Sequence, residues 1–179
     1  MLEGAPLLSG VEVVTVNEPD PPALVEVVKG NLIITAGGSD DEIEIDQEGL
    51  ADGQVRVSQG GEGTVLDGFT GDLIVRLGGG DDQLTLKGLD IAGKLVIEGG
   101  AGDDWLEIED VTVGRGAKLD FGMGYADADI AGMVIGGDFR FRARATHYPG
   151  DGTYDDYWLK LYDSRIDGNA VLSAGRGYF

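Results

Sequence analysis

The sequence predicts an all-β fold, a right-handed parallel β-helix (β-solenoid) of about six coils of about 22 residues each. Three observations predict it. Apolar and polar residues alternate in short runs, which indicates strands. Glycine accounts for 32 of the 179 residues and separates these runs. Similar strand starts return at near-regular intervals, as expected for coils that share one core. An antiparallel sandwich also has short strands, but those need not keep one residue type at one offset.

The chain divides into two regions. Residues 1–29 contain four of the five prolines, which prevents a helix or a central strand around 18–22. We expect two extended segments, at 11–16 and 24–28, that form an N-terminal cap or lead-in. Residues 30–179 form the predicted solenoid domain, with a loop insertion at 146–158.

The repeat also predicts a register. The segments expected to open successive coils share a glycine or alanine followed by alternating apolar residues: 30–34, 53–57, 71–75, 93–97, 117–121, 137–141 and 168–172. Alternate residues should point inward, with Leu73 beside Leu95 and Leu95 beside Leu119. On the outer face, Arg76 should lie beside Glu98 in the next coil.

A pair of aspartates recurs ten and eleven residues after three of these starts: Asp40-Asp41, Asp81-Asp82 and Asp103-Asp104. The fifth unit has Asp127 at the first of these offsets. Stacked coils would place such carboxylates about 4.8 Å apart, where like charges repel. A divalent cation would offset the repulsion, and carboxylate and carbonyl oxygens suit Ca²⁺ best. Alternatively, the aspartates and glycines only form solvated turns.

Residues 99–107, Gly-Gly-Ala-Gly-Asp-Asp-Trp-Leu-Glu, match the G-G-x-G-x-D-x-U-x nonapeptide. The chain therefore resembles the calcium-binding repeats of RTX (haemolysin-type) proteins, and 77–84 is similar with one glycine lost. The resemblance implies a Ca²⁺ site between adjacent coils. Its ligands would be the carboxylates of Asp82 and Asp104, adjoined by Asp81 and Asp103, with carbonyls of Gly79, Gly80, Gly100 and Gly102. This chain departs from the family in having one such turn per coil of about 22 residues.

A second candidate site lies in the sixth unit. It gathers basic and aromatic side chains that could bind a carbohydrate or a protein partner: Arg140, Arg142, Arg144, His147, Tyr148, Tyr154, Tyr157 and Trp158. Long loops on repeat scaffolds commonly carry binding residues. The other interpretation is a lid over the end of the core, with the arginines pairing with neighbouring carboxylates.

Charge and composition exclude several functions. Thirteen basic and 33 acidic residues give a net charge of −20, which is unsuited to nucleic acid or anionic membranes. No apolar run approaches the length of a membrane span. The chain has no cysteine and one histidine, which excludes thiolate catalysis and multi-histidine metal sites.

We therefore expect a non-catalytic structural or adhesive module, extracellular or at the cell surface. It would be part of a longer exported chain, since this sequence has no signal peptide. A polysaccharide or a surface protein is the expected partner. The alternative functions are those of a β-helical polysaccharide lyase or hydrolase and of a carbohydrate- or partner-binding module that uses the 146–158 loop.

Overall fold

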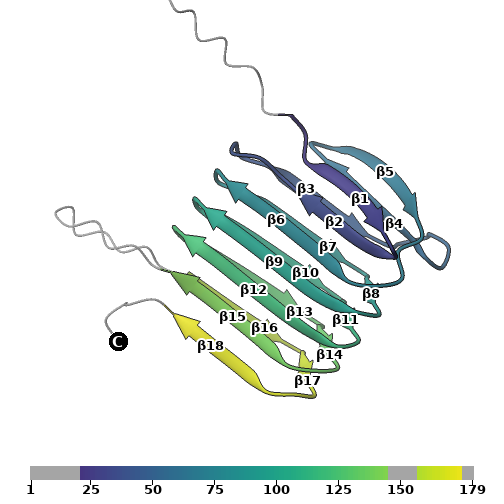
Figure 1. Ribbon diagram of the computed structural model, residues 1–179. Helices are drawn as coiled ribbons and strands as arrows, with labels where there is room; N and C mark the ends of the chain where they lie inside the picture. Colours follow the sequence, from purple (N-terminus) through teal and green to yellow (C-terminus); the bar gives the residue numbers. More distant parts are fainter. Residues whose placement is uncertain (1–20, 145–156, 175–179) are drawn as a thin grey trace, which may run out of the picture.

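The structure, a computed structural model, describes residues 21–144 and 157–174, and all its regular elements there are β-strands in three sheets (Figure 1). The first sheet has the spatial order β1 (Leu24–Val28), β2 (Asn31–Thr35), β6 (Leu73–Gly79), β9 (Lys94–Ala101), β12 (Gly116–Met123), β15 (Phe139–Arg144) and β18 (Ala170–Ala174). The second has the order β16 (Tyr157–Tyr162), β13 (Ala126–Ala131), β10 (Asp104–Glu109), β7 (Gln83–Lys87), β3 (Glu42–Asp46), β4 (Gln54–Gln59) and β5 (Glu62–Asp67). The third has β17 (Arg165–Ile166), β14 (Val134–Ile135), β11 (Thr112–Val113) and β8 (Asp90–Ile91).

Alternation along the strands builds the core, as predicted. Successive side chains of a strand point to opposite faces, so every second residue of a strand such as β9 is buried and the others face solvent. Leu73 and Leu95 are fully buried, and so are Leu84 and Ile91 in the other two sheets. No helix in the described part of the chain is long and apolar enough to cross a membrane.

The predicted parallel β-helix, or β-solenoid, is wrong. The sheets combine parallel with antiparallel pairing and do not form a closed solenoid: β1 pairs antiparallel with β2, and β4 pairs antiparallel with both β3 and β5. The segment 53–57, expected to open a coil, forms β4 of a hairpin instead. Gly60 and Gly61 join β4 to β5 with φ of +54° and +86°, and two such residues make the tight loop that reverses a chain.

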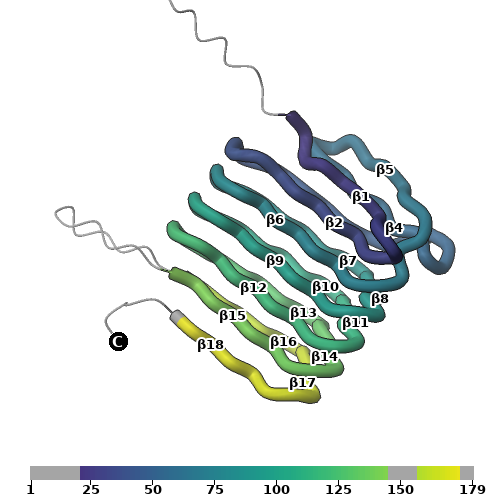
Figure 2. Tube along the Cα trace, in the orientation of Figure 1, coloured from purple at the N-terminus to yellow at the C-terminus, as the bar shows by residue number. Residues whose placement is uncertain are grey.

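Because β4 and β5 form a hairpin and not a coil, the repeat that opens at Gly30 lies directly beside the one that opens at Gly71. Leu32 of β2 pairs with Leu73 of β6, and Ile43 of β3 pairs with Leu84 of β7, both in parallel. The Cα trace shows strands from the later repeats side by side in the same order in each sheet (Figure 2).

The predicted register is right at one boundary and wrong at the next. Leu73 pairs with Leu95, and Arg76 pairs with Glu98, as predicted. Leu95, however, pairs with Ala117, and Leu119 pairs with Ile97. The error is two residues, which keeps every side chain on its predicted face because the strand period is two.

Parts of the predicted ends lie outside the described residues. The segment 24–28 is extended, as expected, and forms β1. The first predicted segment, 11–16, and most of the loop insertion, with His147, Tyr148 and Tyr154, fall outside the described ranges. Tyr157 and Trp158, which end that insertion in the sequence, begin β16.

Candidate functional site

The paired aspartates occupy the turns that lead from the first sheet into the second, before β3 and β7 and at the start of β10. Within two of the pairs the side chains have opposite surroundings. Asp81 and Asp103 are exposed, whereas Asp82 is fully buried and Asp104 is 2% exposed. The pairs therefore form an outer and an inner row along the molecule.

The outer row caps backbone groups of the following repeat. Asp81 donates its backbone N–H to Oδ1 of Asp40 at 2.8 Å. Asp103 donates to Oδ1 of Asp81 at 2.9 Å, and Tyr125 donates to Oδ1 of Asp103 at 2.9 Å. Each of these exposed aspartates thus accepts a backbone N–H of the following repeat.

The inner row runs the other way. Asp41 donates its backbone N–H to Oδ1 of Asp82 at 2.8 Å, and the backbone N–H of Asp82 donates to the carboxylate of Asp104. Each buried aspartate therefore caps the preceding repeat. The predicted stack inserts a coil that opens at 53–57 between the repeats of Asp41 and Asp82, and that order is wrong because β3 pairs directly with β7.

One oxygen of each inner carboxylate has no hydrogen-bond partner: Oδ2 of Asp41, Oδ2 of Asp82 and Oδ1 of Asp104. Burial raises the pKa of Asp82 from 3.8 to about 6, and the charges of neighbouring aspartates act in the same direction. Burial and the charge of Asp82 raise the pKa of Asp104 to about 7. Asp104 is therefore partly protonated at neutral pH.

The glycines of the motif allow these turns to approach closely. Gly100 and Gly102 have φ of +117° and +125°, and a Cβ on them would collide with the carbonyl oxygens of Gly78 and Gly80. Only glycine avoids both the collision and the strained φ. Backbone packing between repeats thus accounts for these two glycines without a bound ion.

The predicted calcium ligands are only partly brought together. Asp82 directly precedes β7 and Asp104 begins the neighbouring strand β10, and their unpartnered buried oxygens have the chemistry that a hard cation accepts. The described residues nevertheless contain no group of three or more acidic, histidine or cysteine side chains arranged to hold a metal. The carbonyl of Gly80 lies against Gly102 of the next repeat. Calcium binding stays a prediction.

Asp127, which stands at the first aspartate offset of the fifth unit, does not continue the outer row. The residue after Asp103 in the outer row is Tyr125, because the backbone N–H of Tyr125 donates to the carboxylate of Asp103. Asp127 instead pairs with Trp105 and lies in the outer face of the second sheet.

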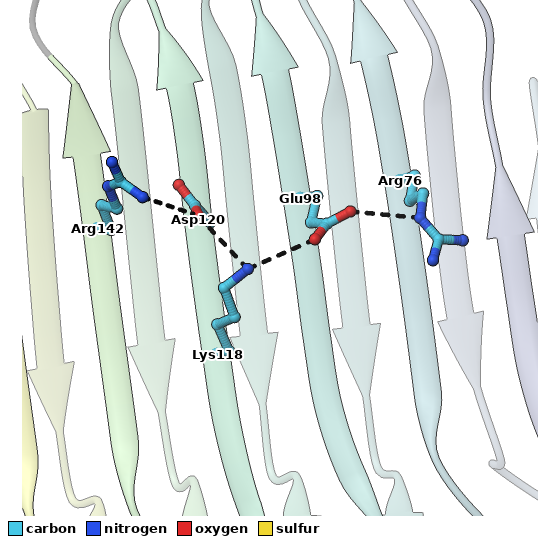
Figure 3. A network of polar contacts seen from close by, with 5 residues as sticks. All are labelled: Arg76, Glu98, Lys118, Asp120 and Arg142. Carbon is cyan, nitrogen blue, oxygen red and sulfur yellow. Dashed lines mark hydrogen bonds and ion pairs between the residues drawn. The ribbon is translucent and has the colours of Figure 1, made fainter.

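One of the three arginines of β15, Arg142, belongs to an outer ion-pair network (Figure 3). Arg140, Arg142 and Arg144 are exposed at alternate positions. Arg142 lies 3.7 Å from Asp120, and Lys118 joins Asp120 to Glu98 with both nitrogen–oxygen distances at 3.4 Å. Arg76 completes the network at 3.3 Å from Glu98. Arg140 pairs separately with Asp138 at 3.6 Å.

Sequence reasoning missed a second polar surface, which we call the tryptophan face. It consists of outward residues of β10, β13 and β16: Trp105, Glu107, Glu109, Asp127, Asp129, Trp158, Lys160 and Tyr162. Trp105 and Trp158 are 48% and 54% exposed. They flank Asp127 in register, one on each neighbouring strand.

Lys160 forms ion pairs with two carboxylates at the centre of the tryptophan face. Its Nζ lies 3.4 Å from Asp127 and 3.6 Å from Asp129. The hydroxyl of Tyr162 donates to Asp129 at 3.4 Å. The signal that could have revealed this face is the alternation in 105–109 and 158–162, read from the outward positions instead of the inward ones.

Similarity to known proteins adds no functional assignment to this geometry. No family model matches the chain, and no curated protein or solved structure is significantly similar to it.

Proposed function

We propose that the chain is a non-catalytic structural and adhesive module of a secreted or cell-surface protein. The observation that carries the proposal is the use of polar side chains between neighbouring strands. The aspartate rows cap the backbone of adjacent repeats, and the outer network ties β6, β9, β12 and β15. Such cross-strand polar contacts hold a displayed surface in place.

Calcium is part of this proposal as a stabilising ion. Asp82 and Asp104 would supply the unpartnered oxygens, and an ion beside them would favour their ionised forms. Outside the cell, calcium is abundant enough to fill even weak sites. An ion bound to the folded state alone stabilises it by mass action, by about 2.7 kcal/mol at one hundred times its dissociation constant.

The test is a thermal melt of the metal-stripped chain at pH 7.5, with chelator and with excess calcium. We expect calcium to raise the melting temperature by roughly 5–10 °C. Asp104→Asn should abolish most of that rise. The matched control is Asp72→Asn, because Asp72 also caps a backbone N–H, that of Lys94 at 2.8 Å, but is partly exposed. The control should retain the full rise.

Two results would count against the proposal. Identical melting temperatures in chelator and in calcium would remove calcium from the proposal. Protons and backbone N–H groups alone would then stabilise the carboxylates. Release of oligosaccharides from a polysaccharide incubated with the chain would contradict the non-catalytic role and favour a lyase or hydrolase.

A further inference from the structure

We infer that the tryptophan face binds a basic, extended segment of a partner protein, with a lysine or arginine side chain seated beside Trp105. The inference rests on the proposed adhesive role and adds the contact surface and the chemical class of the partner.

The tryptophan face contains a hollow of suitable size. A cavity of about 420 Å³ is lined by Trp105, Glu107, Asp127, Asp129 and Lys160, among others. The Trp105 ring lies against Tyr125, with ring centroids 5.7 Å apart and planes tilted by 49°. Because half of Trp105 remains exposed, its ring can contact a bound group.

The charges of the hollow are unbalanced. Among the described residues that line it, four carboxylates, those of Glu107, Glu109, Asp127 and Asp129, face a single ammonium group, that of Lys160. Lys160 pairs with both aspartates, while Glu107 has Thr85 and Asp129 as its strand neighbours. The described residues provide no ion pair for Glu107, so an incoming cation would find it available.

A cation beside Trp105 would gain two favourable interactions. The electron-rich ring attracts it, and the carboxylate of Glu107 pairs with its charge. Trp158 lies two strands away from Trp105, a separation of about 9.5 Å, so a segment that crosses these strands can contact both rings. The net charge of −20 also speeds the approach of a basic partner.

Charge decides between this partner and a neutral carbohydrate. Sugar rings stack on exposed tryptophans as well, but a neutral polymer gains no Coulomb energy from the excess of carboxylates in the hollow. A cationic segment gains from both the rings and the charges.

The probe is an eight-residue peptide of alternating arginine and serine, titrated into the full chain and followed by tryptophan fluorescence and calorimetry. A peptide with glutamine in place of arginine is the neutral comparison. We expect the arginine peptide to bind, and Trp105→Ala to weaken it about tenfold without changing the net charge. Glu107→Gln should weaken it several-fold and reduce its dependence on salt.

The matched control is Glu44→Gln, which removes the same charge from the same sheet. Glu44 is exposed on β3 and is not among the residues that line the hollow, so the variant should bind nearly as the wild type does. Each variant must keep the wild-type melting temperature.

Four outcomes would overturn the inference. Equal losses from Glu44→Gln and Glu107→Gln would show attraction by net charge alone. Equal binding of the glutamine peptide would exclude recognition of a cation. Salt-independent binding of a neutral glucan that Trp105→Ala abolishes would assign the face to carbohydrate. A failed peptide titration alongside the expected calcium-dependent melting would remove this inference and leave the proposed function in place.

Discussion

Asp104 couples the stability of the fold to protons. Its folded pKa of about 7 lies above its ordinary value of 3.8 because burial and the charge of Asp82 disfavour the carboxylate. The folded state therefore binds more protons than the unfolded state between about pH 4 and pH 7, and Asp82 contributes in the same sense. The contribution of these two aspartates to the free energy of unfolding is fully present below their pKa in the unfolded state. It is lost as pH rises through their pKa in the folded state.

This linkage predicts the pH dependence of an Asp104→Asn variant in chelator. The amide keeps the size of the side chain but cannot ionise, so the variant should be more stable than the wild type at pH 8, by about 2 kcal/mol. Its unfolding free energy should change less between pH 5 and pH 8. Urea unfolding at several pH values measures both effects. A wild-type protein that becomes more stable from pH 5 to pH 8 would contradict the assigned direction.

At the residue scale, the sequence predicted that Asp81 meets Asp103 but not how, and it did not predict that the pair Asp40-Asp41 meets Asp81-Asp82. The spacing of 22 residues between Asp81 and Asp103 placed them in contact correctly. The opposite directions of the two hydrogen-bond rows depend on which carboxylate of each pair turns inward. Composition and spacing contain no information on that rotation, so they could not predict that backbone N–H groups satisfy one oxygen of Asp82 and of Asp104.

At the element scale, alternation fixes the face of a strand but not its register. Leu95 and Leu119 were both correctly expected in the core, yet they are two residues out of register because Leu95 pairs with Ala117. A slip of two residues conserves every inward position. The hairpin of β4 and β5 was missed for another reason: the alternation in 53–57 is the same as in the segments that open true repeats, so it predicts one more coil.

Packing against both neighbouring strands predicts the cost of truncating Leu95. Its side chain is fully buried on the central strand β9, so Leu95→Ala should lower the unfolding free energy by about 2–5 kcal/mol. Val96→Ala is the control on the same strand, since Val96 is only partly buried on the outer face, and it should cost about 1 kcal/mol or less. Urea titrations measure both, and equal losses would show that the assignment of inner and outer faces is wrong.

At the scale of the whole molecule, negative charge opposes compactness. The chain carries 33 acidic against 13 basic residues, and their mutual repulsion destabilises the folded state. The ion pairs of the outer network are largely exposed, as for Arg76 and Glu98 with side chains 48% and 44% exposed. Exposed pairs contribute little, so self-repulsion should outweigh them.

This balance predicts that sodium chloride stabilises the protein. Raising its concentration from about 0.02 to 0.5 M screens the repulsion and should add about 1–2 kcal/mol at pH 8. Differential scanning calorimetry in chelator measures the change. Glu44→Gln, which removes one exposed charge, should reduce the effect slightly. A melting temperature that falls with salt would show that the ion pairs dominate.

The spacing of 22 residues between capping aspartates and the N–H groups they accept has a consequence for how such a chain can grow. Capping bonds join residues 22 positions apart from Asp72 to Lys94, from Asp81 to Asp103 and from Asp103 to Tyr125. A gene duplication that inserts one more segment of that length after Asp82 would present the same acceptors to the same donors on both sides. Length can therefore change by whole repeats during evolution, while each junction keeps its hydrogen bonds.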